Sequence, residues 1–258
     1  MKKTLIALAV AASAVVSGSA MAWTANGTGG TSVDLGGTLT PVEKITPWEV
    51  QIGAGTPPAL DAPIQKNQQN VDITTPATIP VLGIRIANAS TFKGQPGISP
   101  NIDYKNAINT SNFSANKATL TLVVNNEQGQ KIGTLSTKLS AMGRLSRTGV
   151  DAANMTTFAS TPMHAFFGGV PVSAAGINDS NLSLVDVLFP GSMANFSGQS
   201  ERYTGKGFAS VSTTSATYSA AYGAGIVKGE KIQIKLDTPA AADAITWKAS
   251  LPVSVSYQ

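Results

Sequence analysis

The chain consists of short segments in which apolar and polar residues alternate, separated by turns rich in Gly, Pro and Asn. A period of two places alternate side chains on one face of a strand, whereas an amphipathic helix requires a period of 3.6. The alternation is clearest over residues 82–86, 120–124, 232–236 and 251–257. About seven to nine short strands with frequent turns predict an all-β fold of the antiparallel sandwich type.

Two of the alternating segments are expected to pair as a hairpin. The turn-forming sequence NNEQG, residues 125–129, directly follows the segment over 120–124. Residues 133–139 then alternate again and provide a return strand. Two alternating segments joined by such a loop predict an antiparallel pair.

The pattern changes between residues 151 and 191, where two segments have helical spacing. Thr161-Pro162 predicts the start of one helix and Gly168 its end. Ser180 or Asn181 is the expected N-cap of the second helix. Together they predict a small helical insertion in a β domain, and insertions on a rigid scaffold often carry binding sites.

Composition excludes most enzyme classes. The chain has no Cys and a single His, so it has no disulfide, thiolate metal site, cysteine nucleophile or site with two imidazoles. The spacing in Gly223–Gly229 is G-x-G-x-x-x-G without a βαβ context, which does not match a dinucleotide loop. Ser90–Lys93 has the S-x-x-K spacing of serine acylases but lacks their companion motifs. We therefore expect neither an enzyme nor a cofactor or metal site.

The first residues have the features of an export signal. Lys2 and Lys3 precede an apolar run of about 13 residues, shorter than the ~20 that span a bilayer as a helix. Ala20-Met21-Ala22 then supplies a small-x-small cleavage site, so we expect a signal peptide over residues 1–22. Without the two lysines, 16 of the 18 basic residues remain against 14 acidic ones. No basic patch with interleaved aromatic residues is present, which argues against a nucleic-acid partner.

The two ends of the mature chain form an informative combination. A polar, Gly-rich stretch is followed by alternating residues at the N-terminal end: Val33, Leu35, Gly37 and Leu39. The last strand alternates in the same way, with its apolar face formed by Leu251, Val253, Val255 and Tyr257. A sandwich that lacked one strand would expose an apolar groove beside its last strand, and an extended segment of a neighbour can fill such a groove. The alternative is an ordinary first strand that pairs within its own chain.

Six stretches, scattered over most of the chain, carry a family resemblance. They are the leader MKKTLIALAVAASA, Ser32–Gly37, Trp48 with Gly53-Ala54-Gly55, Phe166–Gly169, Tyr218–Tyr222 running into Gly225-Ile226, and Trp247 with the strand to Tyr257. In combination they resemble the major subunits of chaperone–usher adhesive fimbriae, of the kappa class of enterotoxigenic enteric bacteria. The resemblance is strongest at the two ends and weakest between about residues 57 and 145. Ile245 departs from it, because many pilins carry Gly at that position.

The resemblance implies an incomplete immunoglobulin-like sandwich that lacks its last strand. Residues 1–22 would be the signal peptide, 23–40 the donor-strand extension, and 41–258 the pilin domain with a helical insertion at about 151–191. Val33, Leu35, Gly37 and Leu39 map onto the donor strand. Leu251, Val253, Val255 and Tyr257 map onto the strand beside the groove, which a periplasmic chaperone would occupy first.

The resemblance also implies a set of partners and a destination. The partners are identical subunits in a fibre, a periplasmic chaperone, an outer-membrane usher and a host glycan receptor. The chain would pass through the periplasm to a fimbrium on the cell surface, where it would mediate attachment to host glycoconjugates. Receptor residues do not transfer from the family, because the insertion is where this chain diverges most.

Four residues in or near the insertion are the candidates for glycan contact: Arg144, Arg147, His164 and Phe166. They combine hydrogen-bond donors with a flat apolar face, which sugar recognition needs. The alternative for these residues is a structural role, as solvated loop charges and core aromatics.

Three other functions compete with the fimbrial subunit. The first is a secreted sandwich lectin that acts as a monomer, with its first strand in its own sheet. An outer-membrane barrel needs alternating strands of about ten residues with aromatic girdles, and only 6% of the residues are aromatic. An exported hydrolase would need His164 as its base, yet no serine elbow is visible in the sequence.

Overall fold

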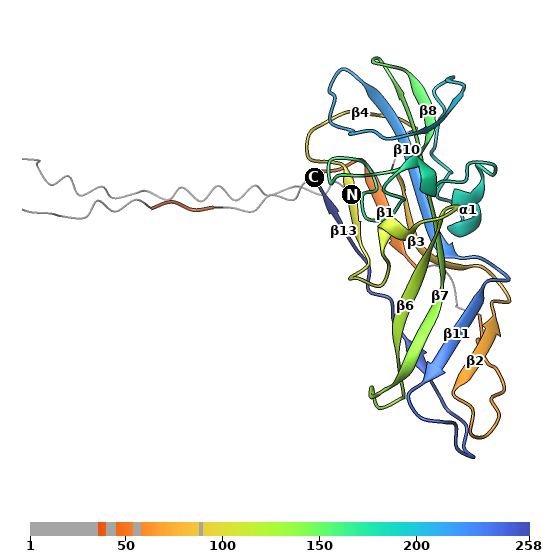
Figure 1. Cartoon of the computed structure of the whole chain (residues 1–258). Helices are drawn as coiled ribbons and strands as arrows, with labels where there is room; N and C mark the ends of the chain where they lie inside the picture. Colours follow the sequence, from red (N-terminus) through yellow and green to blue (C-terminus); the bar gives the residue numbers. More distant parts are fainter. Residues whose placement is uncertain (1–35, 40–44, 54–57, 88–89) are drawn as a thin grey trace, which may run out of the picture. The chain divides into compact units, whose positions relative to one another are not determined.

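The computed structural model describes residues 36–39, 45–53, 58–87 and 90–258. The chain divides into two units, Met1–Lys44 and Ile45–Gln258, and the elements described below belong to the second unit. Its strands, shown in Figure 1, are β1 (Trp48–Ile52), β2 (Asn70–Thr74), β3 (Ile79–Ile86), β4 (Phe92–Lys93), β5 (Pro100–Asp103), β6 (Lys117–Asn125), β7 (Lys131–Thr148), β8 (Ala153–Thr157), β9 (Tyr203–Gly207), β10 (Thr217–Ile226), β11 (Lys231–Leu236), β12 (Lys248–Ala249) and β13 (Ser254–Tyr257). The helical elements are two 3₁₀ turns, η1 (Thr110–Asn112) and η2 (Ala174–Gly176), and the short helix α1 (Leu184–Leu188).

The long strand β7 organises the sheet, because each of its edges carries two partners in succession (Figure 1). One edge pairs with β6 and then with β8, and the other pairs with β11 and then with β10. The main path through the sheet runs β1-β3-β10-β7-β11-β2, and β13 pairs with β5 in a separate two-stranded sheet. Only the β8–β9 pair is parallel among the strand pairs of the described residues.

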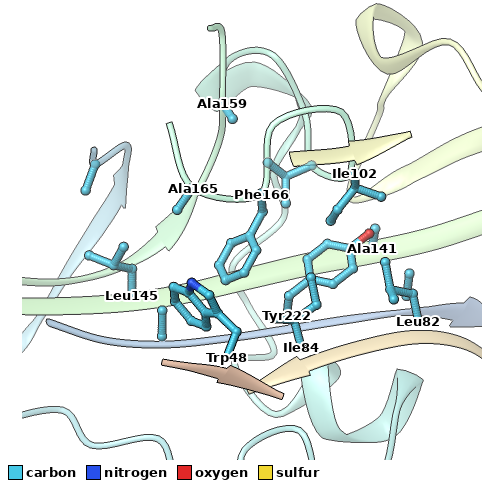
Figure 2. Close-up of a cluster of buried hydrophobic side chains, with 14 of the residues drawn as sticks. Trp48, Leu82, Ile84, Ile102, Ala141, Leu145, Ala159, Ala165, Phe166 and Tyr222 are labelled. Carbon is cyan, nitrogen blue, oxygen red and sulfur yellow. The ribbon is translucent and has the colours of Figure 1, made fainter. Parts of the chain in front are cut away.

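Aromatic side chains form the centre of the larger hydrophobic cluster (Figure 2). Phe166 stacks on Tyr222 with ring centroids 5.3 Å apart and contacts Trp48 edge-on at 6.0 Å. The Tyr222 hydroxyl donates to the Gly169 carbonyl at 2.9 Å and accepts from Tyr104 at 2.8 Å. Burial raises the pKa of both tyrosines. The two buried tyrosine hydroxyls are therefore paired, which avoids the desolvation penalty of an unpaired hydroxyl.

The structure confirms the all-β sandwich and three of the strands that alternation predicted. Of the last predicted strand, over residues 251–257, only Ser254–Tyr257 forms a strand, β13. Residues 82–86 lie in β3, 120–124 in β6 and 232–236 in β11. The predicted hairpin is the antiparallel β6–β7 pair, although β7 extends to Thr148, well beyond the predicted return strand.

The prediction of a helix from Thr161 to Gly168 is wrong, because this segment forms a series of turns. Its local backbone hydrogen bonds span three residues, as in turns, and two of its N–H groups bind distant segments. The Phe166 N–H donates to the Pro100 carbonyl at 2.7 Å, and the Ala165 N–H donates to the Ala209 carbonyl at 3.0 Å. Phe166 also has a φ of 66°, which is incompatible with a right-handed helix.

The second predicted helix exists as α1, which is five residues long. The predicted apolar face of this helix is confirmed, since Val185 and Leu188 are buried. The predicted N-cap, Ser180 or Asn181, is wrong, because Ser183 is the N-cap. The side chain of Asn181 instead accepts hydrogen bonds from the backbone N–H and the hydroxyl of Ser183, at 3.1 and 2.7 Å.

A substitution at Gly83, in β3, tests whether Phe189, which follows α1, packs against the sheet. A Cβ at this position would lie 2.4 Å from the ring of Phe189. We expect Gly83→Ala to destabilise the protein by about 1–3 kcal/mol through overpacking, measured by denaturant unfolding.

The control is the same substitution in a Phe189→Ala background, because the three atoms nearest the added Cβ all belong to the Phe189 ring. There Gly83→Ala should change stability by no more than about 0.5 kcal/mol. An equal cost of Gly83→Ala in both backgrounds would contradict the packing of Phe189 against Gly83.

Candidate functional site

The C-terminal segment is half buried along its whole length. From Trp247 to Tyr257, each odd-numbered residue is partly buried and each even-numbered residue is exposed. Trp247 and Ala249 pack on the smaller hydrophobic cluster, formed with β2 and β11, and the next four inward residues pack on the larger one: Leu251, Val253, Val255 and Tyr257. The predicted apolar face of the last strand therefore exists, and none of its members is fully covered.

Each strand of this segment has one ladder partner among the described residues. β12 pairs with β6, and β13 pairs with β5. The opposite edge carries no strand of the described chain. An unpaired edge presents a row of backbone N–H and C=O groups that can bind another strand.

A groove of about 820 Å³ runs beside the first half of this segment. One wall is formed by residues 58–64, the other by residues 241–249, and the floor by β2 and β11. Within the part of the chain that the structure describes, no backbone hydrogen bond joins the two walls. Most of the large side chains that line the groove are apolar: Leu60, Ile64, Val71, Ile73, Ile234, Leu236, Ile245 and Trp247.

The chemistry of the groove suits an extended apolar segment rather than a charged ligand. Its charged lining residues are Asp61, Asp243 and Lys248, at the rim of a largely aliphatic surface. Main-chain bonds along an open strand edge supply affinity for a peptide, and alternate side chains in apolar pockets supply specificity. We call the feature formed by residues 58–64, 241–249, β2 and β11 the acceptor groove.

The predicted donor segment is described only in part. Val33 and Leu35 lie outside the described residues. Leu39 is 97% exposed, and no atom lies within 4 Å of a Cβ built at Gly37. Residues 36–39 belong to the first unit, so the pairing of the donor segment stays a prediction.

The structure does not bring the four candidate glycan residues together. Arg144 is 5% exposed, and its guanidinium donates to the Asn154 side chain at 2.7 Å and to the Met155 carbonyl at 3.3 Å. The rings of Phe196 and Tyr203 lie 5.2 and 5.3 Å from the guanidinium carbon. Burial lowers the pKa of Arg144. Its donors thus serve the interior of the protein.

The other three candidates occupy different environments. Phe166 is fully buried in the core, so its ring offers no face to a ligand. Arg147 is partly exposed and forms an ion pair with Asp151. Arg144 and Arg147 are three residues apart in β7, which places them on opposite faces of the strand.

His164 lies in an aromatic cluster that the sequence did not predict. Its ring stacks on Phe208 with centroids 4.4 Å apart, and Phe158 contacts Phe208 edge-on at 5.4 Å. Phe208 remains 50% exposed. Burial lowers the pKa of His164, and its Nδ1 accepts from the Ser160 N–H at 3.3 Å. Phe158 and Phe208 meet because they follow the parallel strands β8 and β9, which are far apart in the sequence.

The described residues contain neither a cluster that could hold a metal ion nor a helix that could cross a membrane. No group of three or more His, Cys, Asp or Glu side chains is arranged to hold a metal ion in the described ranges. Nor does any helix in them have the length and apolar character needed to cross a membrane.

The chain is similar to fimbrial proteins along its whole length. A family model described as "Fimbrial, major and minor subunit" matches residues 1–258. This chain belongs to that fimbrial subunit family. It is 30% identical to the K88 fimbrial protein AC of Escherichia coli over 286 residues, and 29% identical to the K88 fimbrial protein AD of the same species over 287 residues, with both chains fully covered. The F41 fimbrial protein of Escherichia coli is 28% identical over 285 residues, again over the full length of both chains.

Membership in the family fixes the broad role of this fimbrial subunit. It is a structural protein of adhesion rather than an enzyme, and it polymerises with other subunits into a fibre. Fimbriae are surface appendages, so the fimbrial subunit functions outside the cell. The resemblance inferred from the two ends of the sequence is thereby confirmed.

A substitution at Arg144 tests whether this side chain has a structural role or contacts a glycan. Arg144→Ala leaves the buried Asn154 side chain without its donor and opens a space between two aromatic rings. We expect a loss of about 1–3 kcal/mol in unfolding free energy, measured by denaturant titration.

Arg147→Ala serves as the control, since it removes a partly exposed ion pair and should cost less than about 1 kcal/mol. A stable Arg144→Ala protein with impaired adhesion would contradict the structural role.

Proposed function

We propose that this fimbrial subunit assembles by donor-strand exchange, with residues 23–40 of one subunit filling the acceptor groove of the next. Residues 1–22 act as a signal peptide that directs the chain to the periplasm, and residues 41–258 form the pilin domain. A periplasmic chaperone covers the groove first, and an outer-membrane usher then passes the subunit into the growing fibre.

The single observation that carries this proposal is the half-buried C-terminal strand beside the acceptor groove. Six inward side chains from Trp247 to Tyr257 pack on the core but are not fully covered. A strand placed on the open edge of this segment would cover them and pair the exposed backbone groups at the same time. The hydrophobic effect then favours any segment with a matching apolar face.

The N-terminal segment has the required pattern. Val33, Leu35, Gly37 and Leu39 alternate, so all four side chains face the same side of an extended strand. Gly37 suits a shallow part of the groove, where a larger side chain would hold the strand away.

We also propose that the assembled fibre attaches to host glycoconjugates. Of the four residues that the sequence favoured, Arg147 and His164 keep exposed atoms, whereas Arg144 and Phe166 are enclosed. The aromatic cluster formed by Phe158, His164 and Phe208 places a half-exposed ring beside an imidazole and is the surface we propose for sugar contact. Phe158 and Phe208 were not identified by spacing in the sequence.

A peptide complementation experiment tests donor-strand exchange. Mature protein that lacks residues 23–40 is mixed with a synthetic peptide of that segment, and thermal stability and native size are followed together. We expect the truncated protein to stay monomeric and to gain a large increase in Tm with the peptide, because ligand binding to the folded state stabilises it.

Two variant peptides serve as controls for the effect of the added segment. The Leu35→Asp peptide should not raise the Tm of the truncated protein, since it places a charge against the apolar groove. The Asp34→Ala peptide, which is altered on the outward face, should raise the Tm as much as the parent peptide does. The proposal is refuted if truncation leaves the Tm unchanged and the peptide alters neither the Tm nor the native size. That result would favour a monomeric secreted lectin.

A further inference from the structure

Ile245 is the most open of the large apolar side chains that line the acceptor groove. It is 37% exposed, whereas the other seven are buried or partly buried. It also lines a second cavity of about 390 Å³, which adjoins the turn at residues 126–128. Ile245 therefore projects into open space, and a strand that enters the groove has to fit around it.

The backbone on either side of Ile245 is free to pair with another strand. Before it, the Ala240 N–H donates to the Gln68 carbonyl at 2.8 Å, and the Ala240 carbonyl accepts from the Asn67 N–H at 2.9 Å. After it, Lys248 is the next anchored residue, because it pairs with β6. Residues 241–247 form no backbone hydrogen bond within the described part of the chain. An incoming strand can therefore bind the N–H and C=O groups of this segment.

The donor segment has one position without a side chain on its apolar face. Gly37 shares that face with Val33, Leu35 and Leu39. A glycine inside a strand loses packing, and it is found where another group must approach the backbone closely. Facing residues of antiparallel strands have Cβ atoms about 4.5–5.5 Å apart. A large donor side chain opposite Ile245 would therefore compete with it for the same space, whereas Gly37 would not.

We propose that Gly37 of one subunit lies opposite Ile245 of the next, and that Ile245 thereby fixes the register of the donor strand. This inference rests on the proposed donor-strand exchange and names a residue that determines its specificity. Ile245 is also the residue at which the sequence departs from many pilins, so this selection is a property of the present chain.

This register also suits the apolar face that follows Ile245. In an antiparallel pair it places Leu35 beside Trp247, which is only partly buried against the smaller hydrophobic cluster and gains cover from a donor side chain. A shifted register that set Leu39 against Ile245 would instead leave Gly37 over Trp247. The indole ring would then stay without apolar cover, so the shift loses burial at both positions.

The test is competition by synthetic peptides during polymerisation of the full mature chain. The probes are the peptide of residues 23–40 and the same peptide with Gly37→Val or Gly36→Val, which add one side chain to the inward or the outward face of the donor. The peptide concentration that halves polymerisation is measured by size-exclusion chromatography. We expect the Gly36→Val peptide to match the parent peptide within about threefold, and the Gly37→Val peptide to require about tenfold more or above.

Reciprocal changes in the subunit make the outcome specific. Ile245→Ala removes as many carbon atoms as Gly37→Val adds, so on this variant the Gly37→Val peptide should inhibit as well as the Gly36→Val peptide. Ile245→Val, a smaller change, should give an intermediate ratio between the two peptides. Val123→Ala shortens an exposed apolar side chain outside the groove and should keep the full difference between them.

Two kinds of result would overturn the inference. Equal inhibition by the Gly36→Val and Gly37→Val peptides on the parent chain, or an unchanged ratio on Ile245→Ala, would overturn the pairing while the proposed donor-strand exchange stands. A parent peptide that does not inhibit polymerisation at any concentration would overturn donor-strand exchange and this inference together.

Discussion

An apolar strand face with a neighbour on only one edge is the constraint on which this structure depends. The inward side chains from Trp247 to Tyr257 belong to the same two clusters as the strands around β7, yet each stays partly exposed. Chain connectivity leaves the opposite edge of β12 and β13 without a partner in the described residues. We propose that such a domain lowers its free energy by accepting a strand from outside, which would account for polymerisation in the fimbrial family.

The strands could be predicted from the sequence because their signal is local. Residues such as Leu82, Ile84 and Ile86 alternate, and alternation reports a buried face directly. The segment at Thr161 looked helical by the same kind of evidence, but its N–H groups bind Pro100 and Ala209, and no local pattern records those partners. Both candidate sites are likewise built from segments far apart in the sequence. The burial of Arg144 was missed for the same reason, since Phe196 and Tyr203 contact its guanidinium from segments far away in the sequence.

The central claim is that the N-terminal segment of one subunit occupies the acceptor groove of another, and disulfide trapping in fibres tests it most directly. The natural chain has no Cys, so an introduced pair is the only source of a disulfide. Ala249→Cys is combined in turn with Cys at the inward positions Val33, Leu35 and Leu39, and at the outward positions Asp34 and Thr38. The account predicts a ladder of covalent multimers on non-reducing gels from at least one inward position and from neither outward position. A disulfide confined to single chains, or equal ladders from both faces, would contradict it.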